Sequence, residues 1–167
     1  MRLLLLTLVL LIVFPCRAQE ADAPSKQEIV EVAQKADERV TNFERANQSA
    51  KPYISQVDFE KGMEYSASAH KAVAALSKNT ASPYASASAA ELLIALNQLA
   101  ITAASEARAI SFNGMVTATR GETVSLNALA AADSLTKAQS ALTEISELVG
   151  HTTLRLITTE ERLWSCG

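Results

Sequence analysis

Cysteine is nearly absent from this 167-residue chain, which has only Cys16 and Cys166. Because Cys16 lies beside an N-terminal apolar run that resembles a cleavable segment, we expect the folded protein to keep Cys166 alone. One cysteine cannot form an internal disulfide or a four-cysteine zinc site. The fold is therefore expected to be held together by its apolar core.

Glycine, proline, histidine and aromatic residues are also few: the chain has 5 glycines, 4 prolines, 2 histidines and 5% aromatics. The glycines are too isolated for a phosphate-binding loop, and neither Gly-x-Ser-x-Gly nor Glu-x-x-His occurs. We therefore predict neither an enzyme nor a bound cofactor. The net charge of −3, about −5 once Arg2 and Arg17 are removed, argues against nucleic-acid binding.

One long apolar run is present, LLLLTLVLLIVF at residues 3–14. A helix of this length rises about 18 Å, which is too short to span a bilayer. The small residues Cys16 and Ala18 follow at the two positions that a signal peptidase reads. We predict a secretory signal peptide over residues 1–18, and hence a secreted or periplasmic protein without a stable membrane span after cleavage. The alternatives are an uncleaved anchor and a lipoprotein acylated at Cys16.

From residue 19 onward the composition is that of packed helices, since 29 of these 149 residues are alanine. Residues 19–24 are predicted to be a flexible leader, and residues 25–165 a single domain. The first helix is expected to begin after Ser25, because Ser25 and Glu28 have the spacing of a capping box. Its apolar stripe is Ile29, Val32, Ala33, Ala36, Val40 and Phe43.

The second helix is predicted to start at Ser55, which with Asp58 resembles a capping box. Its core stripe is expected to comprise Phe59, Met63, Ser66, His70, Val73 and Ser77. The third helix, about 83–119, carries the stripe Leu92, Leu96, Leu99, Ala103, Ala107 and Ile110. Its polar arc is expected to comprise Glu91, Gln98, Thr102, Ser105, Glu106 and Asn113.

The fourth helix has the most regular pattern, with a stripe that begins at Val124 and keeps its spacing of four and three past Gly150 to Leu163. A helix stop at Gly150, or a strand after it, is the alternative. We predict that the helix continues to about Trp164 and is bent or weakened near Gly150. Four amphipathic helices with short connections predict an all-α, up-and-down antiparallel four-helix bundle.

Two groups of side chains raise the question of a metal or cofactor site. Glu144, Glu147 and His151 are spaced as metal ligands on a helix, but they point away from the apolar stripe, so we interpret them as a solvated face. His70 falls on the predicted core stripe and is the candidate cofactor ligand, with Met63 or Met115 as a second ligand to haem. The simpler interpretation of His70 is a core histidine that bonds a facing polar side chain or water.

The third helix has a wider apolar arc than one neighbour requires, because Ile94, Ile101 and Phe112 lie well round from its main stripe. These residues and the Cys166 thiol are the candidate interaction site. The favoured function is an exported, non-enzymatic interaction or structural module of the periplasm or cell exterior. Its partner would be a second copy or another envelope or extracellular protein. The alternative function is a small-ligand, haem or metal-binding bundle that uses the interior around His70.

Overall fold

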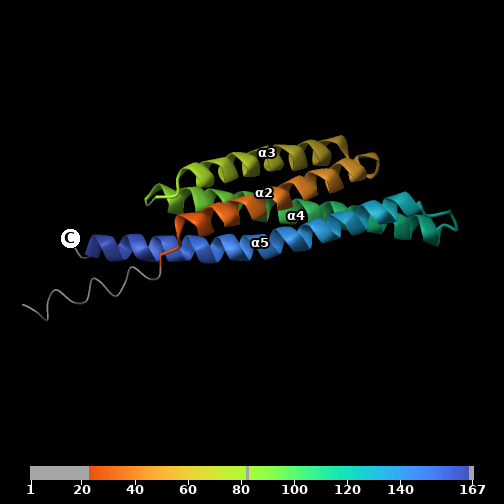
Figure 1. Cartoon of the computed structure of the whole chain (residues 1–167). Coiled ribbons are helices and arrows are strands. Elements are labelled where there is room, and N and C mark those ends of the chain that lie inside the picture. The colour runs from red at the N-terminus through yellow and green to blue at the C-terminus, as the bar shows by residue number, and fades with distance from the viewer. Residues whose placement is uncertain (1–22, 82, 166–167) are drawn as a thin grey trace, which may run out of the picture.

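The computed structural model describes residues 23–81 and 83–165, with side chains as far as Glu161. Four long helices follow one another: α2 (Lys26–Ala50), α3 (Gln56–Lys78), α4 (Tyr84–Thr119) and α5 (Leu126–Ser165). The short helix η2 (Lys51–Tyr53) links α2 to α3. Sequential helices run antiparallel, and α5 packs against both α4 and α2 (Figure 1). The predicted all-α four-helix bundle is confirmed.

Several predictions fall outside the described residues. They are the signal peptide at residues 1–18, the leader as far as residue 22, and the Cys166 thiol. The side chains of residues 162–165 also lie outside, so the last position of the predicted stripe on α5 stays a prediction.

Helix α2 begins as its sequence predicts. The Glu28 backbone N–H donates to Ser25 Oγ at 3.1 Å, and the Ser25 backbone N–H donates to Glu28 Oε2 at 3.3 Å, which completes the capping box. All six predicted stripe residues are buried. The helix then continues to Ala50, and Pro52 lies within η2, where a proline near the first position of a helix is tolerated.

The predicted core stripe of α3 is partly wrong. Ser66 and Val73 are buried as expected, but Phe59, Met63 and His70 are only half-buried and Ser77 is exposed. The buried residues are instead Gly62, Ser66, Ala69, Ala72, Val73 and Leu76. The helices approach closely here, because a Cβ atom added at Gly62 would lie 2.6 Å from Asn47 Nδ2 and 3.3 Å from Phe43 Cζ. Small side chains therefore face α2, and the larger ones lie at the edges of the contact.

The stripes of α4 and α5 form the centre of the core. All six predicted stripe residues of α4 are buried, and Leu92, Leu96 and Leu99 have no exposed surface. On α5, the predicted positions from Ala131 to Leu156 are buried. Ala128 and Thr159 are only half-buried, and Val124 precedes the helix. The turn between the two helices includes Gly121, whose φ of 72° lies in the left-handed region that glycine adopts readily.

Gly150 lies within an uninterrupted α5, which excludes both the helix stop and the strand. The two threonines that follow remain in the helix, and each hydroxyl donates to a carbonyl four residues earlier: Thr152 Oγ1 to Leu148 O at 3.0 Å and Thr153 Oγ1 to Val149 O at 2.7 Å. The helix therefore continues through the glycine as predicted. The weakening at Gly150 stays a prediction.

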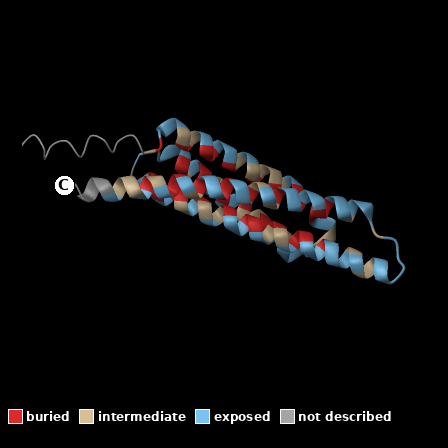
Figure 2. Cartoon of the chain, turned by 90° about the horizontal axis from the view of Figure 1, so that it is seen from below, coloured by how far each residue is buried: buried red, intermediate tan, exposed pale blue. Residues whose placement is uncertain are grey.

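The two hairpins differ in length, since α4 and α5 have 36 and 40 residues against 25 and 23 for α2 and α3. The α4–α5 hairpin therefore projects beyond the α2–α3 turn (Figure 1). Buried residues concentrate where all four helices lie together, and the projecting end is mostly exposed (Figure 2). We call residues 112–131 the projecting tip.

Candidate functional site

Glu106 is the polar residue whose environment differs most from the prediction. It was assigned to the polar arc of the third helix, but only 4% of its surface is exposed. Neither Oε1 nor Oε2 has a hydrogen-bond partner among the described residues. An unpaired buried carboxyl group costs free energy, so its retention in a core position suggests a function.

Glu106 lines a cleft of about 430 Å³ between α4 and the segment that contains η2 and the first turns of α3. Tyr53, Asp58, Lys61 and Tyr65 line the cleft from that segment. Burial of the carboxyl group raises the pKa of Glu106 from 4.5 to about 7, with a smaller contribution from the charge of Asp58. Near neutral pH this carboxyl group is therefore close to half-ionised.

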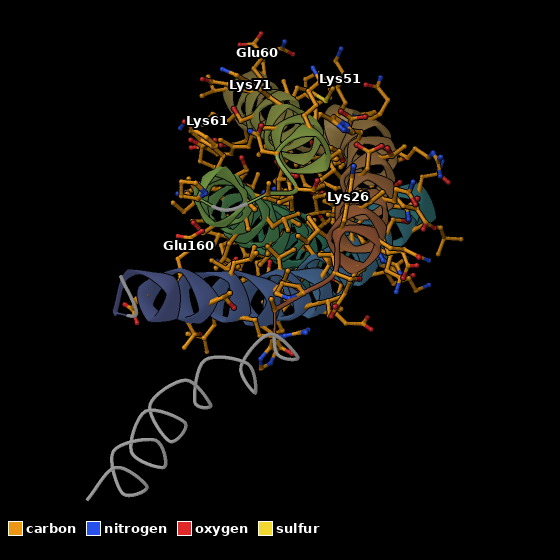
Figure 3. The ribbon with its side chains drawn as sticks, turned by 60° about the vertical axis from the view of Figure 1, so that its left-hand side comes forward. Lys26, Lys51, Glu60, Lys61, Lys71 and Glu160 are labelled. Carbon is orange, nitrogen blue, oxygen red and sulfur yellow. The ribbon has the colours of Figure 1, made fainter. Side chains whose placement is uncertain are left out.

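Asp58 is held in place by the start of α3. Ser55 Oγ donates to Asp58 Oδ2 at 2.6 Å and accepts from the Asp58 backbone N–H at 3.1 Å. Lys61 follows one turn later and projects from the side of α3 that overlies α4 (Figure 3). Within the described residues, Lys61 forms no ion pair with Asp58 or Glu106, so the cleft keeps two carboxyl groups and one separate ammonium group.

Asn47 connects α2 to the same end of α3. It is completely buried, and its Nδ2 donates to the Phe59 carbonyl at 3.2 Å. Its Oδ1 atom has no partner among the described residues. The contact between Asn47 and the first turn of α3 helps to fix the position of the segment that walls the cleft.

His70 lies at the edge of the α2–α3 contact, with 33% of its side chain exposed, and not in the interior. Its Nδ1 is 2.7 Å from Asp37 Oδ1, and its Nε2 is 3.3 Å from Glu44 Oε1. Ser66 Oγ also donates to Glu44 Oε1 at 2.5 Å. The bond to a facing polar side chain is thus confirmed. Both ring nitrogens lie beside carboxylates. A haem iron or a metal ion could therefore bind His70 only if it displaced Asp37 or Glu44.

The methionines considered as second ligands do not join His70 in a bundle interior. Met63 is half-buried on α3, and Met115 is exposed on α4. Glu144, Glu147 and His151 are all exposed, as predicted, and border a surface depression with Lys35 and Arg39 from α2. Over residues 23–81 and 83–161, no group of three or more histidine, cysteine, aspartate or glutamate side chains could hold a metal ion.

The predicted apolar arc of the third helix is exposed. Ile94, Ile101, Phe112 and Met115 are each 59–66% exposed, and we call these four residues the outer face of α4. Helix α4 is also, among the described helices, the one long and apolar enough to cross a membrane by length and composition. This is weak evidence, because a core helix of a soluble protein meets the same criteria.

Sequence reasoning missed Glu106 although its spacing carried a signal. Leu99, Ala103, Glu106 and Ile110 continue the four-and-three spacing of the stripe, so the pattern itself placed Glu106 in the core. The prediction instead groups Glu106 with the other polar residues of the polar arc. No family model matches this chain, and no curated protein or solved structure is significantly similar to it.

Proposed function

We propose that this protein is an exported, non-enzymatic helical module that acts in the periplasm or cell exterior by self-association through the outer face of α4. The observation that carries the proposal is the exposure of four large apolar side chains along one helix. Exposed apolar surface of this kind is unfavourable in water unless another surface covers it. The apolar run at residues 3–14 supports export.

The spacing of these residues suits helix-to-helix contact. Ile94, Ile101 and Met115 are separated by multiples of seven residues, and Phe112 lies between the last two. Side chains at seven-residue intervals stay close to one face of a helix and can pack against a second helix. Arg108 occupies the remaining seven-residue position, where its aliphatic stem can lie on the apolar surface with the guanidinium group in water.

A second copy of the chain is the occupant that the charge pattern favours. Glu91 and Arg108 are the exposed charged residues on α4, so the face is almost uncharged and two copies do not repel each other. A twofold contact brings the same surface from both copies together.

Support for a non-enzymatic role comes from the histidines, the usual general bases. Both nitrogens of His70 face carboxylates of α2, which leaves the ring no free position to activate a nucleophile. His151 is exposed beside Glu147 on the solvated side of α5.

Sedimentation equilibrium of the chain from Gln19 onward tests the proposal. We expect concentration-dependent dimers, with association at least about tenfold weaker in Ile94→Asp and Phe112→Asp because each buries a charge in the contact. Asn113→Asp is the matched control: the same charge enters at an exposed position next to Phe112, but about 100° round the helix from Phe112 and on the side away from Met115. Cys166→Ser, with and without reductant, separates covalent from non-covalent association. A wild-type chain that stays monomeric, or equal effects of the three aspartates, would overturn the proposal.

A further inference from the structure

We propose that the cleft between α3 and α4 binds a small organic cation, an ammonium or guanidinium group on a short apolar body, with Glu106 as the carboxylate that accepts its N–H donors. The cleft borders the outer face of α4, because Ile101 belongs to both. Ile94 and Phe112 do not line the cleft, so the variants at these two positions test self-association without changing the cation site.

The Glu106 carboxyl group has unmet hydrogen-bonding capacity. Both carboxyl oxygens lack a donor among the described residues, and the side chain is 4% exposed. Buried polar groups in proteins are almost always paired, so a group that supplies N–H donors completes this site. Ammonium and guanidinium groups carry three and five such donors, and charge-assisted hydrogen bonds to a carboxylate are strong.

The sign of the ligand charge follows from the groups that line the cleft. Asp58 and Glu106 are acidic and Lys61 is basic, and Tyr53 and Tyr65 contribute phenol rings; α2 and α5 contribute no lining residue. The Asp58 carboxylate acts on Glu106 strongly enough to oppose its ionisation. A cation placed between the two carboxyl groups relieves this repulsion, whereas an anion would add to it.

The walls of the cleft suit an apolar body attached to the cation. Tyr53 and Tyr65 offer aromatic faces, on which an organic cation can rest, and Ile54 and Ala109 offer aliphatic surface. The Gln98 side-chain amide supplies a further acceptor for N–H donors. A volume of about 430 Å³ falls within the range of small-molecule sites.

The ammonium group of Lys61 competes with an external cation for this site. Its ammonium group lines the cleft, forms no ion pair among the described residues and is carried by a flexible four-carbon stem. It can enter the cleft when no ligand is present. Removal of this ammonium group should therefore strengthen the binding of an external cation.

Isothermal titration calorimetry of the folded chain from Gln19 onward, with n-butylammonium, n-butylguanidinium, butanol and butyrate as probes, tests the proposal. We expect both cations to bind and the other two probes not to bind. Glu106→Gln, which keeps the shape and removes the charge, should weaken cation binding at least about tenfold, as expected for a charge-assisted contact. Glu91→Gln is the control, because it removes an exposed carboxylate of α4 outside the cleft. Lys61→Met should raise the affinity.

The pH dependence gives a second readout. Since only ionised Glu106 pairs with the cation, butylammonium should bind about a hundredfold more weakly at pH 5 than at pH 8 for a carboxyl group that titrates near 7. Nα-acetyl-lysine methylamide distinguishes the two sources of the cation. Tighter binding of this probe than of butylammonium assigns the site to a basic side chain of a polypeptide, and weaker binding assigns it to a free amine.

Four results would overturn the proposal. They are equal cation affinity in wild type and Glu106→Gln, binding of butyrate in place of butylammonium, displacement of butylammonium by millimolar Ca²⁺, and no change of affinity between pH 5 and pH 8. Circular dichroism of each variant confirms that it is folded before binding is measured.

Discussion

Replacement of Glu106 by glutamine should change how the stability of the bundle depends on pH. Burial holds the pKa of Glu106 at about 7 in the folded chain, against 4.5 when it is exposed in the unfolded chain. The folded state thus binds this proton more tightly. The protonated carboxyl group therefore contributes to the free energy of unfolding. This contribution is fully present below pH 4.5 and is lost as the pH rises to about 7.

The size of the effect follows from the interval between the two pKa values. At 1.36 kcal/mol per pH unit, the interval from 4.5 to about 7 corresponds to a loss of about 3 kcal/mol. Glutamine has the same shape and does not ionise, so Glu106→Gln should escape this loss. Relative to wild type, the variant should gain about 3 kcal/mol of unfolding free energy between pH 4 and pH 8, whatever constant offset the substitution adds.

Urea denaturation followed by circular dichroism from pH 4 to pH 9 measures this difference. Other titrating groups are common to both chains and cancel in the comparison. Glu91→Gln, at an exposed position on the same helix, should track wild type within about 0.5 kcal/mol at every pH. A flat difference between wild type and Glu106→Gln across this range would show that Glu106 ionises normally, and the account of its burial would then be wrong.

Three further predictions concern packing, and each is measured as the free energy of unfolding. Gly150→Ala should stabilise the chain by up to about 1 kcal/mol, because the new Cβ would lie 3.9 Å from Leu93, an ordinary van der Waals contact, and alanine favours helix; a loss of stability would contradict this fit against Leu93. Gly62→Ala should destabilise it, since the clash with Asn47, about 1–3 kcal/mol, outweighs the same helical gain; a gain would show that the helices can separate easily. Leu96→Ala should lower the free energy of unfolding by about 2–5 kcal/mol, and Glu144→Ala by at most about 0.5 kcal/mol. A larger loss for Glu144→Ala than for Leu96→Ala would show that the buried and exposed faces are assigned the wrong way round.

The parts of the fold predicted well are those in which large apolar side chains repeat without interruption. In α5 the spacing from Ala131 to Leu156 defines the buried face. The same spacing correctly predicted that the helix continues through Gly150, although a glycine by itself would suggest a helix end. A periodic pattern integrates many residues, so one helix-breaking residue does not outweigh it.

The errors arose where burial depends on a neighbouring helix and not on the residue itself. On α3, the larger residues Phe59 and Met63 were assigned to the core, but the close approach at Gly62 leaves room only for small side chains. Glu106 was grouped with the other polar residues of the polar arc, although the segment from Tyr53 to Tyr65 lies over it. Neither the interhelical distance nor the covering segment is encoded in the local pattern of a single helix.

The unequal lengths of the two hairpins have a consequence for local unfolding. The projecting tip lacks the cover of α2 and α3, and most of its residues are exposed. Segments with few buried contacts open without global unfolding, so amide hydrogens of the tip should exchange with solvent well before those of the segment around Leu96 and Leu142. The molecule therefore combines a slowly exchanging body with an end that separates and re-forms independently, and exchange at that end would slow when another chain covers it.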